Sequence, residues 1–243
     1  MLGFLQPTQG HAWIDNHECW HEGVEARRSV TYLPGELRLY ENMTGRQIIR
    51  FLSDIRGAGE IHNLEPLAQR FDIDIDKPLS QMSSGMKRKV ALLQVLVLQA
   101  KLIIMDEPTN TLDPSMRDEL LLQVKQAREN GQSVLFSSHV LSEVEQVCDR
   151  VGILQKGKLV HVQQMSELRE GRRVHAHFQS PIQNVPDIPG LTVREQKNNE
   201  LIFEHTGSAP SLFEWLGQQP LLDLRMEPLG LAPIYYRYHG VTE

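Results

Sequence analysis

The sequence of 243 residues predicts an α/β protein: a parallel sheet core, a helical subdomain inserted into that core, and a small α+β region after it. Three observations lead to this prediction. Short aliphatic segments that end in polar turns indicate buried strands, two amphipathic helices lie between such segments, and the composition changes near Gly171. We expect one domain over residues 1–170, with its helical subdomain at about 44–98, and an accessory region over residues 171–243.

Composition argues against several classes of protein. A net charge of −6 with scattered basic residues does not suit a nucleic-acid binder, which usually shows a basic face. Cys19 and Cys148 lie far apart, without zinc-site spacing, and this fits a reducing, cytoplasmic setting. The most apolar segment, residues 90–100, is about half as long as a membrane span and contains glutamines. We expect small-molecule or protein partners, no nucleic acid and no direct membrane insertion.

The amino-terminal part is expected to form two short strands, residues 12–14 and 29–33, around a polar loop. Y-L-P-G-E, residues 32–36, then predicts a loop leaving the second strand, because proline removes a donor and glycine permits a turn. Thr44 predicts the N-cap of a helix that runs to about Arg56 and ends at Gly57. The apolar face of this helix is expected to hold Ile48, Ile49, Leu52 and Ile55.

A second helix is expected at about residues 60–71, and the acidic run at residues 72–76 is interpreted as a solvated linker. Residues 80–89, S-Q-M-S-S-G-M-K-R-K, precede an apolar helix. Small residues at a helix start leave backbone N–H groups open, and the macrodipole favours an anion there. Ser83, Ser84 and Gly85 are therefore candidates for binding a phosphate, and an ordinary serine-capped helix is the alternative.

Residues 101–108, K-L-I-I-M-D-E-P, predict a buried strand that delivers Asp106 and Glu107 at its carboxyl end, where ligands of parallel sheets bind. A strand that simply ends in a charged turn is the alternative. T-N-T-L-D-P, residues 109–114, predicts a turn and then a helix to about Asn130. The next buried strand is expected at residues 132–138, and His139 follows it at the same sheet edge, as a hydrogen-bonding imidazole or as a structural histidine.

The rest of the chain is expected to contain a helix at residues 140–150, a hairpin around Lys156 and Gly157, and then the α+β region. That region shows strand-like segments at residues 174–178, 191–193 and 201–203 and a helix near 211–216. The tyrosines near the end are expected to pack on their own domain, with partner binding as the alternative.

In this order the motifs resemble those of the nucleotide-binding subunit of an ATP-binding-cassette (ABC) transporter, over about residues 1–164. L-I-I-M-D-E-P is similar to the Walker B strand, which implies that Asp106 holds magnesium and that Glu107 polarises the attacking water. M-S-S-G-M-K-R-K is similar to the ABC signature. The resemblance implies that the γ-phosphate of ATP on the opposite subunit is held by Ser83, Ser84, Gly85 and Met86.

T-N-T-L-D-P resembles the D-loop, which implies that Asp113 crosses a dimer interface, and His139 matches the switch histidine that contacts the γ-phosphate. The family implies a P-loop NTPase-like core, ATP and Mg²⁺ as cofactors, and ATP hydrolysis coupled to transport. It also implies a second ABC subunit, in a homo- or heterodimer, and a transmembrane permease subunit. Through the permease the chain would be peripheral on the cytoplasmic face of the membrane.

Two departures from the family pattern stand out. In Y-L-P-G-E, Gly35 takes the place of the glutamine that binds the metal, and Glu36 is the candidate substitute. This loop, the S-S-G-M signature and the carboxy-terminal region are similar to the ABC-2 type exporter branch, so export is favoured over import. No G-x-x-x-x-G-K-[ST] occurs in the 243 residues, and residues 1–10 resemble the last helical turn and the P-T-x-G turn that come after that P-loop. We expect the sequence to begin after the Walker A motif.

Three functions are therefore weighed. The first is a transport ATPase whose sequence starts after the P-loop, with the 243 residues alone neither binding nor hydrolysing ATP. The second is a catalytically incompetent partner or regulatory subunit that lends its signature motif to another subunit's ATP site. An in-frame P-loop within ~50 codons before Met1 would favour the first, since a strand–loop–helix unit has about that size. A non-transport ABC ATPase acting on DNA or ribosomes is disfavoured by the absence of a basic surface.

Overall fold

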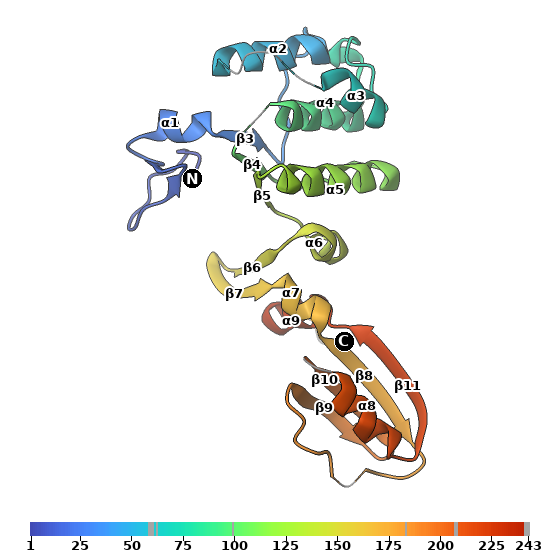
Figure 1. Ribbon diagram of the computed structural model, residues 1–243. Helices are drawn as coiled ribbons and strands as arrows, with labels where there is room; N and C mark the ends of the chain where they lie inside the picture. Colours follow the sequence, from blue (N-terminus) through green and yellow to red (C-terminus); the bar gives the residue numbers. More distant parts are fainter. Residues whose placement is uncertain (58–60, 62, 99, 183, 207–208, 241–243) are drawn as a thin grey trace. The chain divides into compact units, whose positions relative to one another are not determined.

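The computed structural model describes residues 1–57, 61, 63–98, 100–182, 184–206 and 209–240 (Figure 1). The chain forms two compact units, residues 1–143 and 144–243. The domain boundary expected between residues 170 and 171 stays a prediction. None of the helices within the described ranges combines the length and the apolar composition that a membrane crossing requires.

A parallel sheet lies at the centre of unit 1, with β4 (Leu102–Met105) between β3 (Val30–Leu33) and β5 (Ser133–Phe136) (Figure 1). Leu33 pairs with Met105, and Met105 pairs with Phe136. The strands therefore end in register, and the three loops that follow them begin side by side at one edge. The parallel α/β core predicted from the sequence is confirmed.

The burial of these strands differs from one to the next. In β4, Ile103 and Met105 are buried, as the aliphatic run predicts. The prediction that β5 is also buried is wrong: its residues alternate between exposed and half-buried, and Leu135 is 48% exposed. Ser133 and Leu135 point to the same face of the sheet, and this face of β5 is left exposed by the described residues.

The helical subdomain begins with α2 (Gly45–Arg56), as predicted. Thr44 and Gln47 form a reciprocal capping box, and Gly57 ends the helix in the left-handed conformation. Ile48 and Ile49 are buried, but Ile55 is 67% exposed, so its assignment to the buried face is wrong. Ile55 lies in the last turn of α2, where the buried side of the helix carries Ser53 instead.

The second helix, α3 (Leu64–Arg70), is shorter than predicted, and the expected start at Glu60 lies outside the described residues. In the acidic run the carboxylates are exposed, while Ile73 and Ile75 between them are buried. The 3₁₀ turn η1 (Leu79–Gln81) leads to α4 (Ser84–Val97), which contacts α2, α3 and β3. Helix α4 carries buried residues around much of its surface, and this is typical of a central helix.

Helix α5 (Pro114–Glu129) starts with proline in its first turn, and Gly131 follows it with φ +81°, as the sequence predicts. The amino-terminal loop prediction is wrong. Residues 13–28 contain a hairpin of β1 (Trp13–Ile14) and β2 (His17–Glu18), followed by α1 (Gly23–Arg28). Asp15 and Asn16 both adopt positive φ, the geometry of a tight type I′ turn.

Helix α6 (Leu141–Val147) begins in unit 1 and ends in unit 2. In unit 2, β6 (Arg150–Gln155) and β7 (Lys158–Gln164) form the predicted hairpin, and α7 (Met165–Glu170) follows. An antiparallel sheet then has the order β11-β8-β10-β9 (Figure 1). Its strands are β8 (Arg172–Phe178), β9 (Leu191–Lys197), β10 (Glu200–His205) and β11 (Leu221–Pro228).

Helix α8 (Ala209–Gly217) buries Leu212 and Trp215 in a core with Phe178 and Phe203 of this sheet. The predicted α+β character of this region agrees with the structure, but strand β11 and helix α9 (Ala232–His239) were not foreseen. The ring of Tyr238, on α9, stacks on that of His161 with centroids 5.5 Å apart. This contact lies within unit 2, but it joins the tail to His161, a residue of the domain predicted over residues 1–170. The expectation that the tyrosines pack on their own domain stays a prediction.

Candidate functional site

The carboxyl edge of the parallel sheet brings four polar side chains together. The hydroxyl of Ser137 donates a hydrogen bond to Asp106 Oδ1 at 2.6 Å, and its oxygen accepts one from the backbone N–H of Glu107 at 2.9 Å. His139 Nδ1 lies 2.8 Å from Glu107 Oε2. The structure thus brings together three residues predicted from the sequence, Asp106, Glu107 and His139, and adds Ser137.

The backbone of Glu107 adopts an unusual conformation, with φ +46°. For a residue with a side chain this region costs of the order of 1–3 kcal/mol, and such residues persist only where their surroundings hold them. Three groups do so here: Ser137 accepts from the Glu107 N–H, while the Glu107 carbonyl accepts from Asn110 N at 3.2 Å and from Arg88. Outliers of this kind cluster at functional sites, and this one aims a carboxylate at His139.

Gly35 lies against the Asp106 carboxylate. A Cβ atom at Gly35 would come within 2.8 Å of Asp106 Oδ2, so the glycine leaves this oxygen uncovered while Oδ1 is bound by Ser137. Carboxylate oxygens are the ligands that Mg²⁺ prefers in proteins, so the residues present fit a magnesium ion at Asp106. Glu36 is exposed and makes no hydrogen bond or ion pair within the described part of the chain. Its role as a ligand stays a prediction.

The head of α4 forms a separate group. Ser83 is the N-cap, its hydroxyl oxygen accepting from Met86 N at 3.2 Å, and both Ser83 and Ser84 are exposed. A Cβ at Gly85 would lie 3.3 Å from the carbonyl oxygen of Thr111, so the helix start packs closely on the turn after β4. Within the described residues, no hydrogen bond joins this head to Asp106, Glu107 or His139. The signature-like residues and the acids are therefore two distinct groups in one chain.

Asp113 caps helix α5. Its Oδ1 accepts from the Ser115 hydroxyl at 2.7 Å and from Met116 N at 3.0 Å, and these bonds, the one from Ser115 foremost, lower the pKa of its exposed carboxyl. The carboxylate therefore has a structural role within its own subunit. The contact across a dimer interface stays a prediction.

Buried Glu143 is a residue that the sequence analysis missed. Its Oε2 accepts a hydrogen bond from the hydroxyl of buried Thr109 at 2.9 Å and one from Ser138 Oγ at 3.3 Å. Glu143 thus ties the turn after Glu107 to the segment that carries His139. A single acid at the start of a short helix gave no signal in the sequence, because its burial depends on which loops meet at the sheet edge.

Arg88, the other missed residue, is 3% exposed and donates to backbone carbonyls of the loops after β3 and β4. It stands in the run K-R-K, which has the composition of a solvated helix start. The only signal was its position on an apolar helix, one turn after the head of α4. The helix turns Arg88 inward and leaves Lys87 and Lys89 half-exposed.

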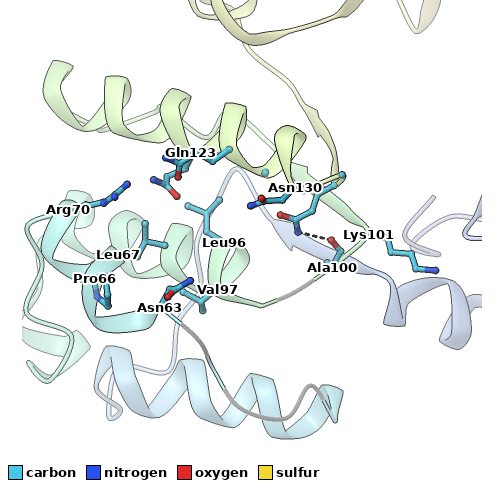
Figure 2. Close-up of a pocket in the computed structure, with 14 residues that line it drawn as sticks. Asn63, Pro66, Leu67, Arg70, Leu96, Val97, Ala100, Lys101, Gln123 and Asn130 are labelled. Carbon is cyan, nitrogen blue, oxygen red and sulfur yellow. Dashed lines mark hydrogen bonds between the residues drawn. The ribbon is translucent and has the colours of Figure 1, made fainter.

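A cavity of about 840 Å³ lies elsewhere in unit 1, among α3, the end of α4 and α5 (Figure 2). Its wall includes Arg70, Gln123 and Asn130, and Gln132 Nε2 donates to the Ala100 carbonyl at 2.7 Å. None of the predicted site residues lines it. The cavity is therefore no part of the candidate site.

Comparison with known proteins gives consistent matches. The family model described as ABC transporter matches residues 1–110. The bacitracin transport ATP-binding protein BcrA of Bacillus licheniformis is 30% identical over 233 residues, covering 92% of this chain and 73% of BcrA. The linearmycin resistance ATP-binding protein LnrL of Bacillus subtilis is 29% identical over 175 residues, covering 68% of this chain and 55% of LnrL. The chain thus spans little more than half the length of LnrL.

Among solved structures, an ATP-binding subunit of an ABC transporter superposes with a TM-score of 0.65 at 28% sequence identity. The match covers 69% of this chain and 72% of that structure. An ATP-binding cassette in a dimeric, post-hydrolysis state superposes with a TM-score of 0.59 at 18% identity, which supports the fold alone.

Proposed function

This chain belongs to the family of ABC transporter ATP-binding proteins, and from this premise we propose that it is the ATP-hydrolysing subunit of an exporter. One relative is named for bacitracin transport and another for linearmycin resistance, and both names support export over import. The relatives are named as ATP-binding proteins, which favours this function over that of a regulatory subunit without its own ATP site.

The observation that carries the proposal is the group formed by Asp106, Glu107, Ser137 and His139 at one sheet edge. Asp106 would hold Mg²⁺, whose charge offsets that of the β- and γ-phosphates when it is bound. Glu107 orients the attacking water and takes up its proton, which is the help that phosphoryl transfer needs from a side chain. Ser137 fixes the positions of both acids relative to each other.

His139 orients the Glu107 carboxylate. An ionised carboxylate only accepts hydrogen bonds, so Nδ1 of the imidazole must carry the proton of the 2.8 Å contact. A neutral imidazole then has an acceptor at Nε2, and only the protonated ring can donate to a phosphate from that atom. His139 therefore contacts the γ-phosphate either as an imidazolium or after it has released Glu107.

The separation of the α4 head from the acids supports a dimer in which each subunit completes the other's site. Ser83, Ser84, Gly85 and Met86 would bind the γ-phosphate of ATP on a second ABC subunit, because the open N–H groups and the dipole of a helix start attract anions. Asp113 would face the same partner. A transmembrane permease would hold the pair at the cytoplasmic face of the membrane.

The test is ATP hydrolysis by the protein expressed from its natural gene and purified with its permease. We expect hydrolysis that requires Mg²⁺, and we expect Ser84→Arg to abolish it, because the larger side chain covers the exposed head of α4. Ser211→Arg, at an exposed position in the first turn of α8, is the matched control and should keep parental turnover. A purified complex without ATP hydrolysis, or one in which Ser84→Arg turns over like the parent, would contradict the proposal.

A further inference from the structure

Arg88 is almost fully buried, and its guanidinium group donates hydrogen bonds to two loops with all of its N–H groups. An arginine has five N–H donors, and here each has an acceptor. All the acceptors are backbone carbonyl oxygens: Nη1 donates to Pro34 (2.9 Å) and Gly35 (3.0 Å), Nη2 to Asp106 (2.8 Å) and Glu107, and Nε to Pro108 (3.4 Å).

This arrangement fixes the loops after β3 and β4 relative to each other. A buried charge is tolerated only where fixed dipoles or counter-charges replace the water it has lost, and carbonyl dipoles of both loops do so here. Burial lowers the pKa of Arg88, whereas the charges of Asp106 and Glu107 raise it. The planar fork of a guanidinium restrains its acceptors in direction as well as distance, unlike the point charge of a lysine.

The same hydrogen bonds hold the backbone that carries the acids. Arg88 binds the carbonyls of Asp106, Glu107 and the following proline, so it contacts the peptide units on both sides of the left-handed Glu107. It also stands one turn after the head of α4, on the same helix. A movement of the α4 head would therefore also move the Arg88 guanidinium group relative to Asp106 and Glu107.

We propose that Arg88 is a positioning residue that holds Asp106 and Glu107 in a fixed relation to the head of α4, so that ligand binding at Ser83–Gly85 is transmitted to the acids of the same subunit. The inference rests on the proposed function for the identity of that ligand, the ATP of a second subunit. Arg88 touches neither metal nor nucleotide in this role. It links two groups that have no direct hydrogen bond within the described residues.

Hydrogen exchange of the purified protein tests the positioning directly. Arg88→Lys keeps the positive charge but cannot reach both loops with three donors. We expect the backbone amides of residues 35–36, 106–107 and 109–110 to exchange at least about tenfold faster, while α2 and unit 2 exchange as in the parent. Arg46→Lys is the matched control, since Arg46 also binds several acceptors, on Asp76 and Glu65 of the same unit, but contacts neither loop.

Steady-state hydrolysis by the complex with its permease gives the second readout. For Arg88→Lys we expect turnover to fall by about tenfold or more, because the acids lose their alignment. The half-saturating Mg²⁺ concentration should rise, the half-saturating ATP concentration should stay within about twofold, and the control should keep parental values. A loss of folded protein alone would lower turnover without changing the Mg²⁺ requirement.

Two results would overturn the inference. One is unchanged exchange of the amides of residues 35–36, 106–107 and 109–110 in Arg88→Lys. The other is exchange that rises equally throughout residues 1–143, since Arg88 would then stabilise the fold without positioning the acids. A parent complex that hydrolyses no ATP contradicts the proposed function, and the exchange comparison still decides the role of Arg88 in that case.

Discussion

Replacing Gly35 by alanine tests how closely the loop after β3 approaches Asp106, the acid proposed to hold Mg²⁺. The added Cβ would lie 2.8 Å from Asp106 Oδ2 and 3.3 Å from Asp106 Cγ, whereas ordinary contacts begin at 3.4 Å. The carboxylate must therefore shift by roughly half an ångström, an amount that strains its 2.6 Å hydrogen bond from Ser137. Because a side-chain end gives way more easily than backbone, the cost in stability should stay near 1 kcal/mol.

The cost in activity is expected to be larger, because a displacement of this size at a reacting centre lowers turnover by about 10- to 100-fold. The assay is ATP hydrolysis by the complex with its permease, titrated with Mg²⁺ at saturating ATP. We expect lower turnover and a higher Mg²⁺ requirement for Gly35→Ala. The control Gly217→Ala adds the same methyl group where no atom lies within 4 Å. Parental turnover and parental Mg²⁺ dependence in Gly35→Ala would refute the assignment of Asp106.

Three further predictions concern stability, each measured by urea denaturation. Glu143→Leu should lower the free energy of unfolding by about 1–3 kcal/mol, because the buried Thr109 hydroxyl loses its acceptor. Glu143→Gln should lower it by less, and equal losses in the two variants would contradict this role of Glu143. Thr44→Ala should cost about 1 kcal/mol by removing the capping box of α2, and a neutral result would argue against that cap. Burial raises the pKa of Glu204, but hydrogen bonds from two arginines outweigh it and lower the pKa overall. Its contribution is therefore present above the ordinary glutamate pKa and is lost as the pH falls through the depressed pKa. Glu204→Gln should destabilise by up to about 1 kcal/mol at pH 7, and the difference from the parent should disappear once the pH lies below the depressed pKa; a pH-independent difference would contradict the ion pairs.

The sequence predicted those parts of the site that depend on local patterns. Three local patterns carried the prediction: a strand that ends in two acids, a serine cap before an apolar helix, and a histidine after the next strand. The in-register pairing of the parallel strands then brings Asp106, Glu107 and His139 together. Thr44 and Gly57 marked the ends of α2 because caps are local hydrogen-bonding devices.

Features that depend on tertiary contacts were missed. Arg88 and Glu143 are of residue types that are mostly exposed, and both are buried here because loops from distant parts of the chain supply their partners. Burial of β5 was overestimated because an apolar strand does not reveal whether both of its sides are covered. The hairpin at Asp15 was overlooked because its strands are only two residues long.

Glu107→Gln, in the complex purified with its permease, tests the central claim most directly. The amide keeps the shape of the side chain and its contact to His139, but it cannot take up a proton from water. Binding of ATP and its hydrolysis are measured on the same preparation. We predict that bound ATP is retained while turnover falls by about two or more orders of magnitude. Turnover equal to that of the parent would contradict the role of Glu107.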